Sequence, residues 1–123
     1  MNRILLITLA LMLIAVPALA GSKTYYCVAT ASDDVGNESI YSNEVILLLN
    51  EGDDPTFEWD APTTNEDGSV LDDLAGYTLY CGQVSGGPYA HAQDVPDPLA
   101  LTATFTGLNP ARRPSPPGNY RRQ

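Results

Sequence analysis

Short segments in which apolar and polar residues alternate recur along this chain, and they restrict its fold more than any other feature. "TFEWD" (56–60) places Phe57 and Trp59 on one face and Glu58 and Asp60 on the other. The same period of two runs through "TYYCVATA" (24–31) and "LALTATFTGL" (99–108). Six such segments, separated by turn residues, predict short strands. They favour an all-β sandwich of two sheets.

The first twenty residues have the layout of a secretory signal peptide. A positive start, "MNR", precedes an apolar run from Ile4 to Val16, and a small-x-small site ends at Ala20. The run has 13 residues, short of the roughly 20 that span a bilayer as a helix, which disfavours a transmembrane anchor. We therefore predict a signal peptide over 1–20, a secreted or periplasmic protein, and no membrane attachment after cleavage. The folded domain is predicted over 21–110, and the Pro/Arg-rich tail 111–123 is predicted to be disordered.

Charge is distributed unevenly along the sequence. The formal net charge of −9 combines fifteen acidic residues, all between Asp33 and Asp97, with six bases, four of them in "ARRPSPPGNYRRQ" (111–123). Binding to nucleic acid phosphates requires Lys and Arg clustered on a folded face, which so acidic a domain does not offer. We therefore predict no nucleic acid partner, and the acidity favours solubility outside the cell.

Several segments resemble strands of the fibronectin type III domain, in the style of bacterial extracellular members. "FEWDAP" resembles its tryptophan-bearing B strand, and "LAGYTLYCG" with "SGGPY" resembles its C strand and C–C′ turn. "FTGLNP" resembles its E strand, and "TYYCVATASDDVGNESIYSNEV" resembles its F strand, F–G loop and G strand. The resemblance implies an immunoglobulin-like two-sheet sandwich. The chain order, F-G-B-C-C′-E, implies a circular permutation cut at the E–F corner, with strand A missing.

The permuted order leaves three architectures open. Each chain could close on itself, since "NEGDD" (50–54) is long enough to cross between sheets about 10 Å apart. Alternatively, the F–G hairpin of one chain could complete a neighbour by strand exchange, giving a homo-oligomer. The strand "EVILLLN" (44–50), apolar on both faces, motivates this alternative. The third is an out-of-phase fragment of a tandem-domain protein.

The two cysteines fall on strands that are neighbours in the fibronectin type III sheet. By this resemblance Cys27 lies on the inward face of the F-like strand, and Cys81 on the inward face of the C-like strand. We predict a disulfide between them, as an even cysteine count in an exported protein favours. The alternative is a pair of buried free thiols that fill space.

The sequence contains no recognisable catalytic grouping. The single histidine, His91, has no motif around it, and the paired carboxylates lie in predicted loops where charge is normally solvated. We therefore predict that the protein is not an enzyme and acts as an exported binding or adhesion module. A structural subunit assembled by strand complementation is the alternative.

Binding in this fold family usually involves loops at one pole or an exposed sheet. By resemblance the F–G loop is the predicted ligand-binding loop, and its candidate residues are Asp33, Asp34, Asn37, Glu38 and Tyr41. An aromatic patch of Tyr41 with Tyr77, Tyr80 and Tyr89 would suit stacking against a protein or carbohydrate ligand. The alternative, which the sequence favours, is that these tyrosines are ordinary strand residues, since Tyr is common in strands.

The turn "NEDGS" (65–69) clusters oxygen ligands around a glycine. Carboxylate and amide oxygens are the ligands that Ca²⁺ prefers, so Asn65, Glu66 and Asp67 form a candidate calcium site. The spacing does not match a twelve-residue EF-hand loop, and the alternative is a plain acidic turn. No other cofactor is predicted.

Overall fold

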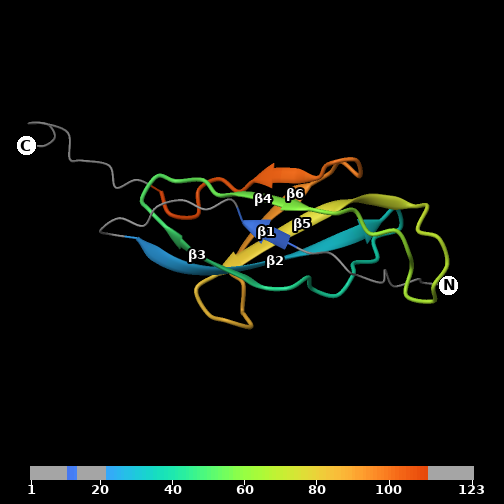
Figure 1. Ribbon diagram of the computed structural model, residues 1–123, viewed down its shortest axis with the longest axis horizontal. Coiled ribbons are helices and arrows are strands. Elements are labelled where there is room, and N and C mark those ends of the chain that lie inside the picture. The colour runs from blue at the N-terminus through green and yellow to red at the C-terminus, as the bar shows by residue number, and fades with distance from the viewer. Residues whose placement is uncertain (1–10, 14–21, 111–123) are drawn as a thin grey trace, which may run out of the picture.

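The computed structural model describes residues 11–13 and 22–110, which form two antiparallel β-sheets and no helix (Figure 1). The strands are β1 (Leu11–Leu13), β2 (Lys23–Asp33), β3 (Val45–Leu49), β4 (Thr56–Trp59), β5 (Leu74–Gly82), β6 (His91–Val95) and β7 (Thr102–Thr104). The predicted tail and, apart from Leu11–Leu13, the predicted signal peptide lie outside the described residues. In the described ranges no helix is long and apolar enough to cross a membrane.

One sheet has the order β1-β4-β7 and the other the order β3-β2-β5-β6. Every pair of neighbouring strands is antiparallel. The longest ladder joins β2 to β5, so these two strands form the centre of the four-stranded sheet. The predicted all-β fold with two sheets is confirmed.

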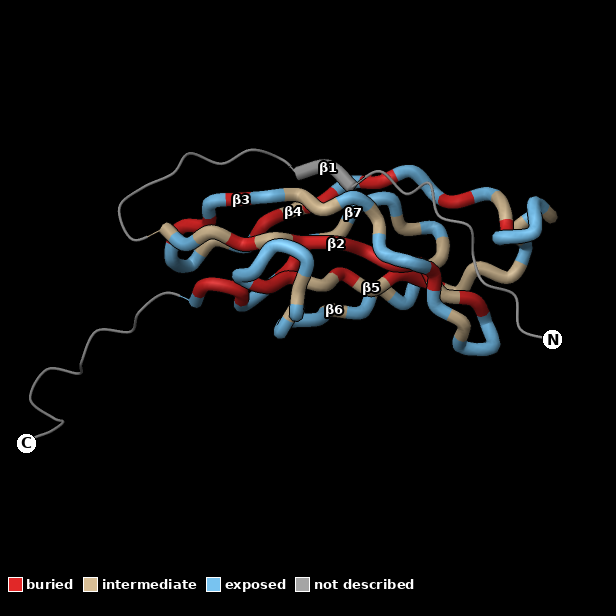
Figure 2. Tube along the Cα trace, turned by 90° about the horizontal axis from the view of Figure 1, so that it is seen from below, coloured by how far each residue is buried: buried red, intermediate tan, exposed pale blue. Residues whose placement is uncertain are grey.

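The core lies between the two sheets and follows the alternation of the sequence. In β4, Phe57 and Trp59 are buried while Glu58 is exposed. Across the core, the Trp59 ring packs against Tyr77 of β5, with ring centroids 5.0 Å apart. Figure 2 shows buried residues concentrated along β2 and β5. From Cys27 to Ala31, β2 is buried on both faces, so its outer face must be covered as well.

The predicted disulfide joins the two central strands. Cys27 and Cys81 are direct register partners, with Cα atoms 4.1 Å apart and sulfur atoms bonded to each other. Both residues are almost fully buried and belong to the core cluster. The bridge therefore fastens β2 to β5 from the side that faces the second sheet.

A strand lies beside β4, at an edge where the sequence interpretation of the mature chain placed none. Leu11–Leu13 forms that strand, with Leu11 opposite Trp59 and Leu13 opposite Phe57. An extended apolar segment can pair with the open edge of β4, whose N–H and C=O groups would otherwise have no strand partner on that side. The sequence interpretation considered only the linker between Asn50 and Thr56, and it assigned the apolar run wholly to the signal peptide.

Three hydrogen bonds hold the end of the described chain against the start of β2 and the end of β3. The hydroxyl of Tyr25 donates to the Leu108 carbonyl at 2.8 Å, and the amide of Asn109 donates to the Leu49 carbonyl at 2.8 Å. The N–H of Gly52 donates to the Asn109 carbonyl at 2.7 Å. Pro110, where the described chain ends, therefore follows a segment fixed at this pole of the sandwich.

Candidate functional site

The candidate site lies on the outer face of the four-stranded sheet, where residues 38–44 run alongside β2. The N–H groups of Ser39 and Ser42 donate to the carbonyls of Ala31 and Ala29, both at 2.8 Å. In return, the serine hydroxyls accept the N–H groups of the same two alanines, at 2.9 Å and 2.8 Å. The segment is thus fixed to β2 without being a regular strand, and Tyr41 is held between the two serine anchors.

Three tyrosines form a packed group on this face, and we call Tyr41, Tyr80 and Tyr89 the tyrosine cluster. The ring of Tyr41 meets Tyr80 edge-on, with centroids 5.6 Å apart and planes at 66°. It meets Tyr89 in the same way, at 5.3 Å and 89°. Edge-to-face geometry is the favourable arrangement for aromatic rings, so the cluster is pre-organised. Tyr41 nevertheless keeps 52% of its surface exposed.

Two carboxylates hold the tyrosine hydroxyls, but they do so differently. Glu38 accepts from Tyr80 and, at 2.5 Å, from the Thr30 hydroxyl, and both bonds use Oε2. Glu44 uses both oxygens: Oε1 accepts from Ser85 at 2.7 Å, while Oε2 accepts from the Gly86 N–H at 2.8 Å and the Tyr89 hydroxyl at 2.6 Å. Glu44 therefore fixes the 83–90 turn to the sheet through hydrogen bonds. Glu38, in contrast, has one carboxylate oxygen, Oε1, without a hydrogen bond to the described residues.

The 83–90 turn lies directly against the sheet at Gly82. A Cβ at this position would sit 2.7 Å from the Pro88 carbonyl oxygen and 2.9 Å from the Tyr89 Cα, closer than real Cβ atoms approach. Only glycine allows this approach without displacing backbone. Gly82 thus positions Tyr89 beside Tyr41.

The hydrogen bonds to carboxylates change the ionisation of the cluster. Burial first, and then the hydrogen bond to Glu38 and its charge, raise the pKa of Tyr80 to about 12. Burial and then Glu44 raise the pKa of Tyr89 to about 12 in the same way. The Gly86 N–H and the hydroxyls of Tyr89 and Ser85 lower the pKa of Glu44. At neutral pH the cluster therefore presents neutral phenols beside negative charge.

A hollow of about 360 Å³ opens beside the tyrosine cluster. It is lined by Thr30, Glu38, Ser39, Ile40, Tyr41 and Tyr80. Its volume is at the small end of ligand sites, enough for one side chain or one sugar ring. Ile40, which is 63% exposed, gives the rim an apolar surface next to the Glu38 carboxylate.

No family model matches this chain. No curated protein and no solved structure matches it either. What can be said of its function therefore rests on its own residues and geometry.

The predicted loop residues separate into two groups. Glu38 and Tyr41 line the hollow, whereas Asp33, Asp34 and Asn37 do not. Asp33 is buried and organises the loop, since Oδ1 accepts the N–H groups of Val35 and Asn37 and Oδ2 accepts the Asn37 amide, at 2.8–3.1 Å. The N–H of Asp34 donates to the Asp73 carbonyl at 3.0 Å. These residues shape the loop rather than the hollow.

Two of the residues predicted to bind calcium, Asn65 and Asp67, use their side chains for hydrogen bonds within their own turn. Asn65 is fully buried, and its amide donates to the Ser69 hydroxyl and the Val70 carbonyl. Asp67 accepts both the N–H and the hydroxyl of Ser69, and Glu66 is exposed. Within the described ranges, no group of three or more His, Cys, Asp or Glu residues is arranged to hold a metal. The calcium site stays a prediction.

Of the four tyrosines in the candidate aromatic patch, Tyr77 is buried in the core and lies outside the patch, as expected for an ordinary strand residue. Its position in the period of two, shared with Leu79 and Cys81, already indicated an inward side chain. Burial raises the pKa of the Tyr77 hydroxyl. Neither the Tyr77 hydroxyl nor the Trp59 indole N–H has a hydrogen-bond partner among the described residues.

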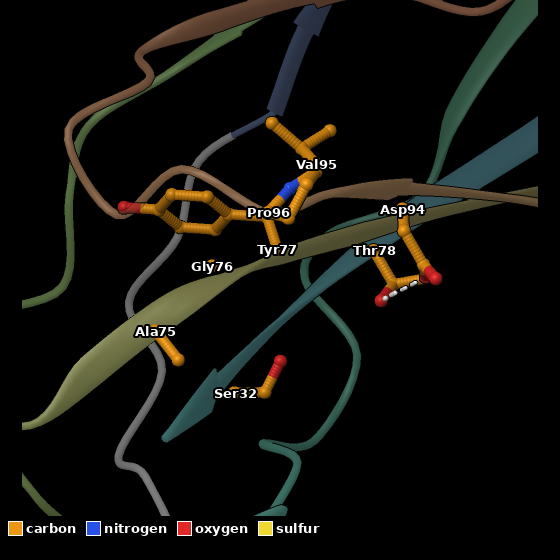
Figure 3. Close-up of a pocket in the computed structure, with 8 residues that line it drawn as sticks. All are labelled: Ser32, Ala75, Gly76, Tyr77, Thr78, Asp94, Val95 and Pro96. Atoms are coloured by element: carbon orange, nitrogen blue, oxygen red, sulfur yellow. Dashed lines mark hydrogen bonds between the residues drawn. The ribbon is translucent and has the colours of Figure 1, made fainter. Parts of the chain in front are cut away.

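Tyr77 also lines a second hollow, of about 250 Å³, between the ends of β2, β5 and β6 (Figure 3). The Thr78 hydroxyl donates to Asp94 there at 3.2 Å, and Figure 3 shows the Tyr77 ring turned away from this pair. Ser32 approaches from β2, but no hydrogen bond links it to Asp94 in the described structure. The side chains labelled in Figure 3 do not converge on one point, so the tyrosine cluster is the better candidate.

Sequence reasoning missed Glu44 and the 83–90 turn as parts of the site. Glu44 follows Asn43 in "YSNEV" and gave no signal, because its partners lie about forty positions further along the chain. The one usable signal was "SGGPY" (85–89), whose glycines and proline predict a tight turn. Such a turn determines the position of a tyrosine that directly follows it, as it does for Tyr89.

Proposed function

We propose that this protein is an exported, non-catalytic binding module with a fibronectin type III-like sandwich in permuted strand order. The strand orders β4-β7 and β3-β2-β5-β6 support the permuted arrangement, since they correspond to B-E and G-F-C-C′. In the uncleaved chain β1 lies at the A position, and cleavage after Ala20 would remove it. The buried disulfide supports export, because such bonds persist in oxidising compartments.

The observation that carries the proposal is the tyrosine cluster with its two carboxylates. Tyr41 is half exposed, yet its ring is fixed by Tyr80 and Tyr89, and their hydroxyls are fixed by Glu38 and Glu44. Aromatic side chains that are rigid before binding lose little conformational entropy when a ligand docks. Such a surface suits a ligand that offers both stacking area and polar groups.

The chemistry of the patch favours binding over catalysis. Among the described residues, two aliphatic hydroxyls of the patch are hydrogen-bonded to a carboxylate. The exposed Ser85 hydroxyl donates to Glu44, whose lowered pKa makes it a poor general base. Thr30, whose hydroxyl donates to Glu38, is only 1% exposed. A nucleophile covered in this way cannot reach a substrate. The carboxylate therefore serves as a hydrogen-bond acceptor at the edge of the hollow.

Arrays of defined glycans and of defined peptides test this proposal. The wild-type protein is expected to bind a restricted set of probes, and Tyr41→Ala is expected to lose that set. Leu99→Ala is the control, because Leu99 is 86% exposed and does not line the hollow. The proposal is wrong if the wild type retains no probe, or if Tyr41→Ala and Leu99→Ala bind alike.

A structural subunit that assembles by strand exchange is the second candidate. Strand β3 forms an edge of its sheet and exposes Ile46 by 63% and Leu48 by 48%. Apolar side chains on an edge strand favour pairing with another chain. Light scattering over a hundredfold concentration range separates the two candidates, since a binding module stays monomeric and an assembling subunit does not.

A further inference from the structure

We infer that the tyrosine cluster binds an extended segment rich in arginine and proline, and that its resident occupant is the C-terminal segment 111–123 of the same molecule. The inference rests on the proposed function and names the ligand class of that same face. Its consequence is that an external ligand must displace this segment before it can bind.

Charge complementarity is the first argument. Residues 22–110 contain all fifteen acidic residues and one base, Lys23, a formal charge of −14. Residues 111–123 contain four arginines and no acid, a formal charge of +4. Two parts of one chain with opposite charge attract each other, and the attraction is strongest where negative charge is fixed and partly desolvated.

The chemistry of the cluster matches that of the segment. Arginine stacks on tyrosine rings and donates N–H groups to carboxylates in a fork. Glu38 Oε1, at the rim of the hollow, accepts no hydrogen bond from the described residues, so such a donor can reach it. "RRPSPP" (112–117) contains prolines at 114 and 117, the spacing at which polyproline segments dock on aromatic grooves. The exposed ring of Tyr41 and the apolar rim at Ile40 supply such a surface.

The segment is long enough to reach the cluster. Pro110 follows residues fixed beside Tyr25 at the start of β2. Tyr80 is paired with Val28, three residues further along β2, which is about 10 Å. The 13 residues beyond Pro110 span roughly 40 Å when extended, so they can reach the outer face with length to spare.

Attachment to the same chain favours this occupant over others. Attachment through a short stretch of the same chain gives a local concentration in the millimolar range, so even weak binding fills the site. A free ligand at micromolar concentration therefore competes at a disadvantage, unless it binds more tightly or the ionic strength is high. Because charge supplies much of the attraction, salt weakens the contact.

The test uses the full chain and the ring resonances of the tyrosine cluster in nuclear magnetic resonance spectra. A variant with Arg112, Arg113, Arg121 and Arg122 replaced by Gln removes the positive charge, and Lys23→Gln is the control for loss of an unrelated base. We expect the ring shifts of the cluster to move in the arginine variant and to stay in Lys23→Gln. Sodium chloride at 0.5 M should move the wild-type shifts toward those of the arginine variant.

A synthetic peptide of residues 111–123 separates this inference from the proposed function. Added to the full-chain arginine variant, it should restore the wild-type shifts, with roughly tenfold weaker binding when Glu38→Gln is also present. If the wild type and the arginine variant have identical shifts, the segment is not the occupant and the inference is overturned. The array experiment then still decides whether the face binds another ligand. Shifts that depend on protein concentration would also overturn it, since the occupant would then come from a second molecule.

Discussion

Breaking the Cys27–Cys81 bond should cost the protein a large part of its stability. The bridge joins residues 54 positions apart, and the chain-entropy relation assigns about 4 kcal/mol to closing a loop of that length in the unfolded state. Domains of this size are stabilised by about 5–15 kcal/mol in total. The reduced protein should therefore be marginally stable, and its unfolding should expose more surface and give a larger m-value in urea.

The measurement is urea unfolding of the oxidised and reduced wild-type protein, followed by the fluorescence of Trp59. This is the single tryptophan of the chain, and it is 4% exposed, so its emission reports the loss of the core. Because both cysteines are buried, the bond should be reduced in urea and the protein refolded by dilution with reductant present. Comparing two forms of one sequence leaves every other side chain unchanged.

A second variant guards against strain from two unbonded thiols in the core. The double variant Cys27→Ala, Cys81→Ala has no thiols in the core. This variant should lose about as much stability as the reduced protein, and a further amount because the packing contacts of two sulfur atoms are removed. If both forms unfold within 1 kcal/mol of the oxidised protein, the bridge does not constrain the unfolded chain. The loop-closure reasoning would then be wrong for this fold.

Three further predictions concern the outer face and its loop. In a titration followed at 295 nm, Tyr80 and Tyr89 should ionise near pH 12. The stability that these two tyrosines contribute is therefore fully present below pH 10 and is lost as the pH rises toward 12. Glu38→Gln should lower the pKa of Tyr80 alone, and an unchanged titration curve would contradict the assigned hydrogen bond. Asp33→Ala should lower the free energy of unfolding in urea by roughly 1–3 kcal/mol, because three part-buried donors lose their acceptor. The isosteric Asp33→Asn should lose less, and equal losses would refute the loop role. Gly82→Ala should displace the 83–90 turn and bring the pKa of Tyr89 back toward 10, whereas a retained value near 12 would show that the turn tolerates a Cβ.

The sheet core could be predicted from the sequence because its signal is local. Alternation fixes which side chains of a strand share a face, and it grouped Phe57 with Trp59, whereas the inward positions of Cys27 and Cys81 were implied by the resemblance. All four residues are buried in the core. The pairing of the two cysteines followed only when the segments were assigned to neighbouring strands. Its confirmation depended on register, with Cys27 directly opposite Cys81.

The candidate site was predicted only in part because its contacts are distant in sequence. Glu38 and Tyr41 lie in the predicted loop, but their neighbours Tyr80, Tyr89 and Glu44 come together only when β5 and the 83–90 turn are in place. Asp33 and Asn37 look like ligand-binding residues in the sequence, since they are polar and lie in a turn. Their side chains instead satisfy the loop's own backbone, as aspartate and asparagine often do.

Strand β1 could not be predicted because the apolar run suits two different roles. A Leu-rich segment inserts into the export machinery as a signal peptide, and the same segment can pair as a strand with an open sheet edge. In the folded chain, Leu11–Leu13 forms three register pairs with β4. Cleavage after Ala20 would remove this strand and leave the outer edge of β4 without it.

Processing therefore has a predictable effect on stability and association. Intact-mass measurement of the exported protein should give a chain that starts at Gly21, and a chain that keeps Met1 would show that the signal-peptide prediction is wrong.

Loss of the hydrogen bonds between β1 and β4 should also lower stability. Hydrogen bonds contribute about 0.5–1.5 kcal/mol each, so the 21–123 form should be about 1–3 kcal/mol less stable than the full chain. Its open β4 edge should also promote association as the concentration rises, measurable by light scattering. Equal stability of the two forms, with both monomeric, would mean that β1 adds nothing to the sheet, and the sandwich would then be complete without an A-position strand.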